Sequence, residues 1–297
     1  LRLGSGSDAL RVESTSAATQ VFGGAGAEQF LVSGSGDTAP AIDGLLTLDG
    51  QGQPAGAGDR LLWSAANAAD ALAGSLSATA IRGLGMGAGI DYRGLEDLSL
   101  TLGPVGEQFA VLGTAAGTAT SVQAAAGPDQ VTVGPALEAV QGPLRIEGGD
   151  DIGDLLRLDD TASTDQAPGT LAAGALRGFG MGAEVHWNGF TALEMSLGAD
   201  PDTLLIEDTD VPTGIDTGDG SDTVTVETLS HASTLTLGAG FDDLTLLHNN
   251  APLSVQAGSG QDRLSVLGTG APVDVDLGAD DDRLTIEASS SFDVEGD

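Results

Sequence analysis

Short alternations of apolar and polar residues recur along the chain and are most regular in its last third. Each covers only a few residues, with the period of two that a short strand with one buried face requires. A first series follows an aspartate every twenty residues, with the apolar pairs Leu204/Ile206, Val224/Val226, Leu244/Leu246, Leu264/Val266 and Leu284/Ile286. A second series lies about ten residues later, at Leu235/Leu237, Leu253/Val255 and Val273/Val275. The pattern predicts two short strands in every twenty residues.

The turns before the first series carry glycine and aspartate at fixed positions. They read G-A-D-P-D (198–202), G-D-G-S-D (218–222), G-A-G-F-D (238–242), G-S-G-Q-D (258–262) and G-A-D-D-D (278–282). Glycine supplies the positive φ of a tight turn. Two strands and two turns form one coil, and coils bury their apolar faces only by stacking, at a spacing of ~4.8 Å. We therefore predict an all-β chain, a parallel β-solenoid similar to a β-roll or β-helix, of about thirteen coils of 20–25 residues. An antiparallel sandwich is the alternative that the constant spacing disfavours.

A longer repeat of 95 residues is superposed on these coils and relates 59–107 to 154–202. It is clearest where 81–103 matches 176–198, with ten of 23 positions identical, including a G-x-G-M-G element. We expect this element to be a widened coil in which glycine permits close backbone approach and methionine fills a gap.

Looser copies of the glycine turn occur earlier, and we expect equivalent turns at Asp8, Glu28, Asp59, Glu107, Asp129 and Asp154. The organisation we expect is a single continuous segment, 1–297, with regular twenty-residue coils over 198–286. The stretches 34–58 and 160–175 are expected to be longer loops that leave the coils.

Composition adds a strong acidic bias. The 297 residues carry a net charge of −34, with ten arginines and no lysine, no cysteine and 3% aromatic residues. Such a surface repels nucleic acid and anionic membranes, so neither partner is expected. The chain has no run of 18 apolar residues, so no segment is expected to insert into a membrane. Acidic chains with few aromatics are often disordered, but the regular strand pattern argues against that alternative.

Stacked turns would place Asp202, Asp222, Asp242, Asp262 and Asp282 in one column. Two unit charges at ~4.8 Å repel by roughly 3.5 kcal/mol at an effective dielectric constant near 20. A divalent cation between turns would reverse the sign of this energy, and Ca²⁺ takes six to eight oxygen ligands in a tolerant geometry. An aspartate that only bonds to its own turn is the simpler alternative.

These turns resemble the calcium-binding repeats of the RTX (haemolysin-type) family, whose nonapeptide reads G-G-x-G-x-D-x-U-x. The resemblance implies Ca²⁺ as cofactor, with ligands first at Asp8, Asp222, Asp242 and Asp262, and next at Asp202 and Asp282. Five further aspartates would thicken the column, Asp200, Asp219, Asp243, Asp280 and Asp281, and of these Asp219, Asp200 and Asp280 are further candidate ligands. The first glycine of the nonapeptide is usually missing here, and each coil has one Gly-Asp turn rather than two. Calcium is therefore expected along one edge only.

The function we expect is structural: a calcium-stabilised repeat segment of a secreted bacterial adhesin, filament or surface-layer-like protein, at the cell surface and without enzymatic activity. The expected partners are neighbouring coils of the same or an identical chain, stacked end to end, and cell-surface polysaccharide. A secretion signal is expected outside this segment. The Gly-Asp coils of this chain, together with its G-x-G-M-G element, resemble those of very large bacterial surface proteins.

The alternative function is a carbohydrate- or surface-binding module. An exposed aromatic cluster of Tyr92, Trp187 and Trp63 would favour it, although Tyr92 and Trp187, at one repeat position, are more typical of core residues. A polysaccharide-degrading enzyme is less favoured, because the arginines are mostly scattered; Arg263 and Arg283 alone fall on neighbouring coils. The three histidines lack the spacing of a catalytic triad or a zinc site.

Overall fold

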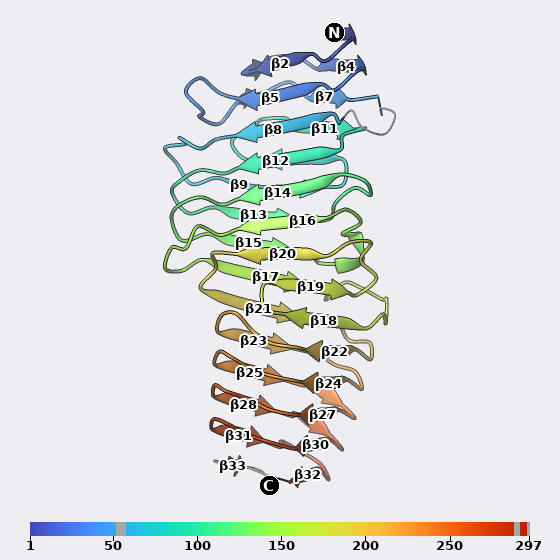
Figure 1. Ribbon diagram of the computed structural model, residues 1–297, viewed down its shortest axis with the longest axis vertical. Helices are drawn as coiled ribbons and strands as arrows, with labels where there is room; N and C mark the ends of the chain where they lie inside the picture. Colours follow the sequence, from blue (N-terminus) through green and yellow to red (C-terminus); the bar gives the residue numbers. More distant parts are fainter. Residues whose placement is uncertain (52–57, 288–291, 296–297) are drawn as a thin grey trace. The chain divides into compact units, whose positions relative to one another are not determined.

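The computed structural model describes residues 1–51, 58–287 and 292–295, and these are nearly all β (Figure 1). Parallel pairing dominates, which confirms the predicted all-β class and is consistent with a β-solenoid. Within the described ranges, no helix is both long and apolar enough to cross a bilayer. Contacts divide the chain into two compact units. The first comprises Leu1–Val133, Ala139–Leu155 and Trp187–Phe190, and the second comprises Gly134–Glu138, Leu156–His186 and Thr191–Asp297.

The first unit has two sets of paired strands. The first set runs, in spatial order, β1 (Arg2–Ser5), β4 (Thr19–Ala25), β7 (Leu46–Asp49), β11 (Ile90–Arg93), β10 (Ala80–Gly83), β9 (Ala73–Ser77), β13 (Gln108–Val111) and β15 (Gln130–Val133). The second set runs β2 (Ala9–Val12), β5 (Gln29–Ser33), β8 (Arg60–Ser64), β12 (Asp97–Thr101), β14 (Ala119–Gln123) and β16 (Leu144–Glu147). A short parallel pair joins β3 (Ser14–Thr15) to β6 (Ala41–Ile42).

The second unit also has two sets of strands. One set runs β17 (Leu155–Asp159), β21 (Ala192–Ser196), β23 (Thr213–Asp216), β25 (Ser233–Thr236), β28 (Leu253–Gln256), β31 (Val273–Asp276) and β33 (Phe292–Glu295). The other runs β19 (Ala175–Gly178), β18 (Gly169–Ala172), β22 (Thr203–Ile206), β24 (Thr223–Val226), β27 (Asp243–Leu246), β30 (Arg263–Val266) and β32 (Arg283–Ile286). The short strands β26 (Ala239–Gly240) and β29 (Ser259–Gly260) pair beside them. The elements β17, η1 (Leu137–Ala139) and β20 (Val185–Asn188) have residues in both units.

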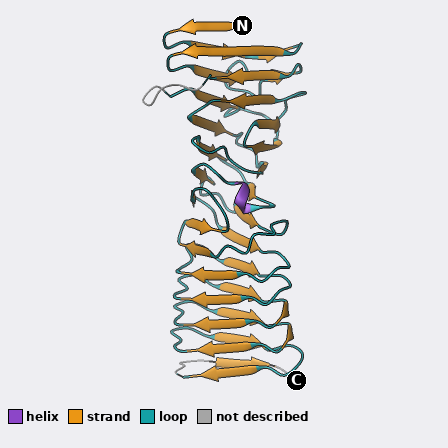
Figure 2. Cartoon of the chain, turned by 90° about the vertical axis from the view of Figure 1, so that its right-hand side faces the viewer, coloured by secondary structure: helices purple, strands orange, loops and turns teal. Residues whose placement is uncertain are grey.

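Along the series β22, β24, β27, β30 and β32, each strand pairs in parallel with the next, twenty residues later, within the stacked rungs that Figure 2 shows toward the C-terminus. The register is unshifted, so that Leu244 aligns with Leu264. Both are buried, whereas Thr245, between Leu244 and Leu246 on the same strand, is partly exposed. The predicted strands, their period of two and their twenty-residue spacing are confirmed over these rungs. A rung is used below for one such twenty-residue repeat.

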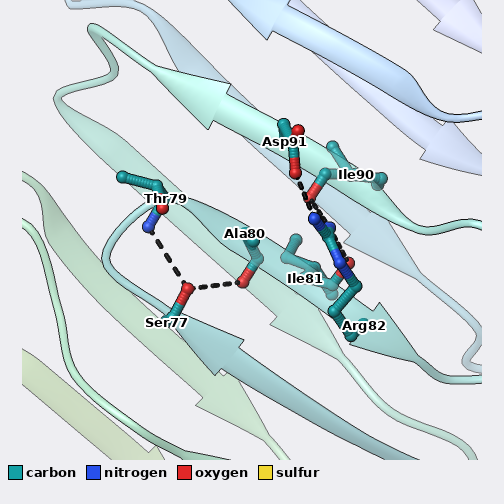
Figure 3. A network of polar contacts seen from close by, with 7 residues as sticks. All are labelled: Ser77, Thr79, Ala80, Ile81, Arg82, Ile90 and Asp91. Carbon is teal, nitrogen blue, oxygen red and sulfur yellow. Dashed lines mark hydrogen bonds and ion pairs between the residues drawn. The ribbon is translucent and has the colours of Figure 1, made fainter.

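The first copy of the G-x-G-M-G region forms an antiparallel meander instead of a widened coil. Strand β10 pairs antiparallel with β9 and β11, while β11 pairs in parallel with β7 and β9 in parallel with β13. The chain therefore reverses twice before it rejoins the parallel pattern. Arg82 on β10 braces this reversal, because its guanidinium donates to the carbonyls of Ile81 (3.1 Å) and Ile90 (2.7 Å) and pairs with Asp91 (Figure 3).

The second copy reverses in the same way, and this corrects the expectation of a widened coil in both. Strand β19 pairs antiparallel with β18 and β20, and β18 pairs in parallel with β22. The reversal needs glycine at Gly83 and Gly178, with φ of +72° and +93°. A Cβ there would lie 2.4 Å from the carbonyl oxygen of Ala73 and 2.1 Å from that of Pro168. The expected close backbone approach is thus confirmed, but it serves a turn.

The large aromatic residues of the duplicated region lie in the core. Tyr92 and Trp187 are 4% and 5% exposed, and Trp63 is 1% exposed. The hydroxyl of Tyr92 donates to the carbonyl of Ser77 at 2.6 Å. The core interpretation of these residues is confirmed, so they form no exposed aromatic platform.

Candidate functional site

The five aspartates of the regular rungs form one column, called here the second-unit column: Asp202, Asp222, Asp242, Asp262 and Asp282. Each of the last four accepts, through Oδ1, a hydrogen bond from the backbone N–H of the column residue one rung earlier. The N···O distances are 2.9 Å for Asp202 to Asp222, 2.8 Å for Asp222 to Asp242, and 2.9 Å for both Asp242 to Asp262 and Asp262 to Asp282. The carboxylates therefore hold successive rungs together.

The backbone of each column residue completes the connection. The carbonyl of Asp222 accepts from the N–H of Asp243, and the carbonyl of Asp242 accepts from the N–H of Arg263, both at 2.8 Å. Each rung is thus fastened to the next by a carboxylate bond immediately before the ladder of the strand begins. This explains why an aspartate must stand at the first turn of every rung: its side chain takes an N–H that the ladder does not reach.

The second oxygen of these carboxylates has no protein partner. Oδ2 of Asp202, Asp222, Asp242 and Asp262 is buried without a hydrogen bond. Asp222, Asp242 and Asp262 are at most 2% exposed, and Asp202 is 8% exposed. A buried oxygen that carries charge and lacks a partner is strongly unfavourable, so it calls for a proton or a cation.

The electrostatic consequence is a raised proton affinity. Burial raises the pKa of Asp202 to about 6, and the neighbouring charge of Asp222 adds to the shift. Burial also raises the pKa of Asp242 to about 6, with added repulsion from the carboxylates one rung to either side. The pKa values of Asp222 and Asp262 are raised as well, again chiefly by burial. Desolvation disfavours the charged form of each carboxylate.

The first unit uses the same bond with less regularity and on both sets of strands. Before β5 and β8, the N–H of Glu28 donates to Asp59 Oδ1 at 2.8 Å, and the N–H of Asp59 donates to Glu96 Oε2 at 2.6 Å. Before β13 and β15, the N–H of Glu107 donates to Asp129 Oδ1 at 2.6 Å. The N–H of Asp129 in turn donates to Asp154 Oδ1 at 2.9 Å. These two series are called here the first-unit columns.

This arrangement corrects the expectation that Asp59, Glu107 and Asp129 occupy equivalent turns. Asp59 precedes β8 in the second set of strands, whereas Glu107 and Asp129 precede β13 and β15 in the first set. The residue that follows Asp59 in its column is Glu96, which the sequence reasoning missed. The inserted meander separates the two by 37 residues, from 59 to 96, and so hides the periodicity.

Two carboxylates of the first-unit columns have higher pKa values than Asp202 and Asp242. Burial raises the pKa of Glu28 to about 7, with further contributions from Asp59 and Asp8. Burial raises the pKa of Asp129 to about 8, and the nearby Glu107 and Asp154 add to it. Both carboxylate oxygens of Glu28 are buried without a hydrogen-bond partner, as is Oδ2 of Asp59.

The predicted calcium ligands divide into three groups by exposure. Asp202, Asp222, Asp242 and Asp262 are buried, Asp8 and Asp282 are half-buried, and Asp219, Asp200 and Asp280 are exposed. Within the described ranges, no three histidine, aspartate or glutamate side chains converge as a metal site. Turn carbonyls also have partners: Ala239 accepts from Gly220 at 2.8 Å, and Gly238 accepts from Ser259 at 2.9 Å. The buried carboxylates are thus brought into line one per rung, rather than gathered around a point.

Another buried acid was also missed. Asp160, 2% exposed, accepts from the N–H of Leu137 at 2.7 Å, and burial raises its pKa to about 7. It stands in a stretch expected to be loop and follows no Gly-x-Gly string, so no sequence signal marked it.

Comparison with known proteins gave no match. No family model, no curated protein and no solved structure resembles the chain closely enough to be assigned. Function must therefore be argued from the geometry of the columns and of the surface around them.

Proposed function

We propose that the chain is a structural repeat segment, a β-solenoid of about thirteen coils, from a secreted bacterial adhesin, filament or surface-layer-like protein. The observation that carries this proposal is the carboxylate column, in which each of four successive buried or half-buried aspartates accepts a backbone N–H from the rung before it. A residue so placed offers no open face to a substrate, and the proposal assigns the chain no catalysis.

We further propose, as the resemblance to the RTX repeats implies, that calcium stabilises the columns. The supporting observation is the unpartnered Oδ2 of Asp222, Asp242 and Asp262, aligned at rung spacing beneath a surface rich in further carboxylates such as Asp219 and Asp280. A cation there would relieve both the desolvation of each charge and the repulsion between neighbours. Millimolar calcium outside the cell would suit sites of modest affinity.

The test is thermal unfolding near pH 8, where the columns are most ionised, with calcium and with EDTA. Because a ligand bound only by the folded state raises its stability, calcium should raise the melting temperature. Magnesium at equal ionic strength is the control for screening, since it prefers a stricter octahedral shell. Equal melting in calcium, magnesium and EDTA would remove calcium from the proposal.

The structural proposal has a separate test. Replacement of Asp242 by alanine removes the acceptor of the Asp222 N–H and should destabilise the protein with or without calcium. If the variant melted like the native protein in both conditions, the column would not hold the rungs together and the structural role assigned to it would be wrong.

A further inference from the structure

Two arginines of the second unit differ from the others in having no partner. Within the described part of the chain, Arg263 and Arg283 form no ion pair, side-chain hydrogen bond or ring contact. The remaining arginines each have one: Arg2 with Phe22, Arg11 with Glu13, Arg60 with Asp97, Arg82 with Asp91, Arg93 with Asp49, Arg145 with Glu147, Arg157 with Glu194 and Arg177 with Glu207. In a chain of net charge −34, two unpaired cations side by side indicate a place where an anion from outside could bind.

The fold sets the spacing of these two cations. Arg263 and Arg283 are the first residues of β30 and β32 and are direct partners across the parallel ladder. Their backbones are therefore ~4.8 Å apart, and both side chains point away from the core, since Leu264 beside Arg263 is buried. Each arginine directly follows a column aspartate, Asp262 or Asp282, so the column fixes the level of both. Two guanidinium groups at this spacing repel until an anion lies between them.

A hollow of about 320 Å³ lies at this pair. Its lining adds Phe241 from the turn before β27, Gln261 from the next turn, and four acids, the column residues Asp242 and Asp262 together with Asp243 and Asp281. Phe241 is 65% exposed and is the one large aromatic side chain that the described residues leave exposed. The preceding rung has Ser221 and Thr223 at the positions of Phe241 and Asp243, so the hollow belongs to particular rungs and is not a general property of the repeat.

The lining specifies the chemistry of a ligand. The arginine pair suits one carboxylate, because guanidinium groups bind carboxylates through paired hydrogen bonds. Asp243, Asp281 and the amide of Gln261 can accept from hydroxyl groups. The exposed ring of Phe241 can pack against an apolar face. A dense polyanion is disfavoured, because Asp243 and Asp281 stand beside the arginines and the whole surface is acidic.

A ring with one carboxylate, several hydroxyls and an apolar C–H face is a sugar acid. We propose that the hollow formed by Phe241, Gln261, Arg263, Asp281 and Arg283 binds a hexuronate unit of an acidic polysaccharide. The arginines bind the carboxylate, the acids and the amide accept from the hydroxyls, and Phe241 covers the C–H face. The site would give a structural segment a specific contact with an extracellular polysaccharide.

The test is binding of trigalacturonate to the intact chain by calorimetry, at one fixed calcium concentration, with neutral galactotriose and free sulfate as comparison ligands. Trigalacturonate should bind more tightly than either. The repeat itself supplies substitutions that the fold accepts: Arg263→Thr with Arg283→Thr copies Thr203 and Thr223, and Phe241→Ser copies Ser221. Loss of the arginine pair should weaken trigalacturonate binding about tenfold or more.

Phe241→Ser should weaken binding of trigalacturonate while leaving that of sulfate unchanged, because only the sugar has a face for the ring. The control is Arg145→Thr, which removes an exposed arginine elsewhere and should change nothing. No binding of trigalacturonate at millimolar concentration, or equal binding by the native chain and the double arginine variant, would overturn the proposal. Sulfate binding as tight as trigalacturonate binding would show a bare anion site and overturn the assignment to a sugar acid.

Discussion

The two units use the same hydrogen bond, from a backbone N–H to a carboxylate, but with different regularity. In the second unit the same aspartate returns every twenty residues and bonds to its neighbour at 2.8–2.9 Å in four successive rungs. In the first unit the acid changes between aspartate and glutamate, the spacing varies, and the columns lie on both sets of strands. What persists is the bond from backbone N–H to carboxylate. The fold therefore needs that bond, while the identity and spacing of the acid can vary.

The less regular first-unit columns contain the two column carboxylates with the highest pKa values. Burial raises the pKa of Glu28 to about 7 and of Asp129 to about 8 in the first unit, but only to about 6 for Asp202 and Asp242 in the second. Burial is the largest cause in all four, and neighbouring acids of the same column add to the rise in both units. The comparison predicts where protons, substitutions and cations should act differently.

The largest expected effect is that of pH, because it sums over all the columns. The folded pKa values lie above the ordinary ones of 3.8 and 4.5, so the folded state holds more protons than the unfolded state between the two. Stability in EDTA should then rise as the pH falls, beginning near pH 8 for the first-unit columns and near pH 6 for the second-unit column, and level off near pH 4. Calorimetry across this range measures it. Saturating calcium should flatten or reverse the rise, since protons and cations compete for the same oxygens.

The next effect concerns two glycines at one motif position, one in each unit. Gly260 has φ +136°, and a Cβ there would lie 1.5 Å from the carbonyl oxygen of Gly240. Gly6 has φ +118° with nothing within 4 Å of its Cβ position. Gly260→Ala should cost about 3 kcal/mol, from strain and collision together, and Gly6→Ala about 1 kcal/mol, from strain alone. Equal losses in urea unfolding would show that rung stacking does not require glycine.

Substitutions in the columns should separate the bond from the charge. Asp242→Ala leaves the buried N–H of Asp222 without an acceptor and should cost about 2 kcal/mol. Asp242→Asn keeps an oxygen in place and should cost less, near pH 8. In the first unit, Asp129→Asn should stabilise the protein near pH 8, because its amide can donate to Glu107 and no charge is buried. Urea unfolding of the three variants tests this, and a destabilised Asp129→Asn would contradict the comparison.

The smallest effects are expected in the two meanders. Arg82 contacts two carbonyls and Asp91 inside its own meander, whereas Arg177 reaches Glu207 outside the strands of its meander. Arg82→Ala should cost about 1 kcal/mol, and Arg177→Ala about half of that, because exposed ion pairs contribute little. Urea unfolding compares them; a larger loss for Arg177→Ala would show that the carbonyl contacts are unimportant.

How far the sequence predicted this structure varies along the chain. The regular rungs could be predicted, because Leu264 and Val266 alternate with polar residues and glycine recurs at fixed offsets. The meanders could not, because alternation marks a strand without giving its direction, and Gly83 fits a widened coil as well as a reversal. The reversal then displaced Glu96 from any recognisable period.

The candidate site could be predicted in position but not in chemistry. Asp222, Asp242 and Asp262 were identified as a column from their spacing alone. Whether each carboxylate binds a cation or a backbone N–H depends on the conformation of its side chain. A pattern of residue types does not specify that conformation. The arginine pair was visible as Arg263 and Arg283 on neighbouring rungs, but the hollow beside Phe241 depends on the exposure of that ring.

The direction of the column bond has a consequence for how such a chain can change in evolution. Each regular rung presents an N–H to the rung that follows and a carboxylate oxygen to the rung that precedes, so every internal rung has the same two connectors. If one whole rung is deleted or duplicated in frame, the two rungs at the new junction again have an N–H facing a carboxylate. A deletion of half a rung would instead bring together parts of the repeat that do not form this hydrogen bond. Length can therefore drift by whole rungs without loss of the fold, and a longer or shorter segment is within reach of a single recombination event.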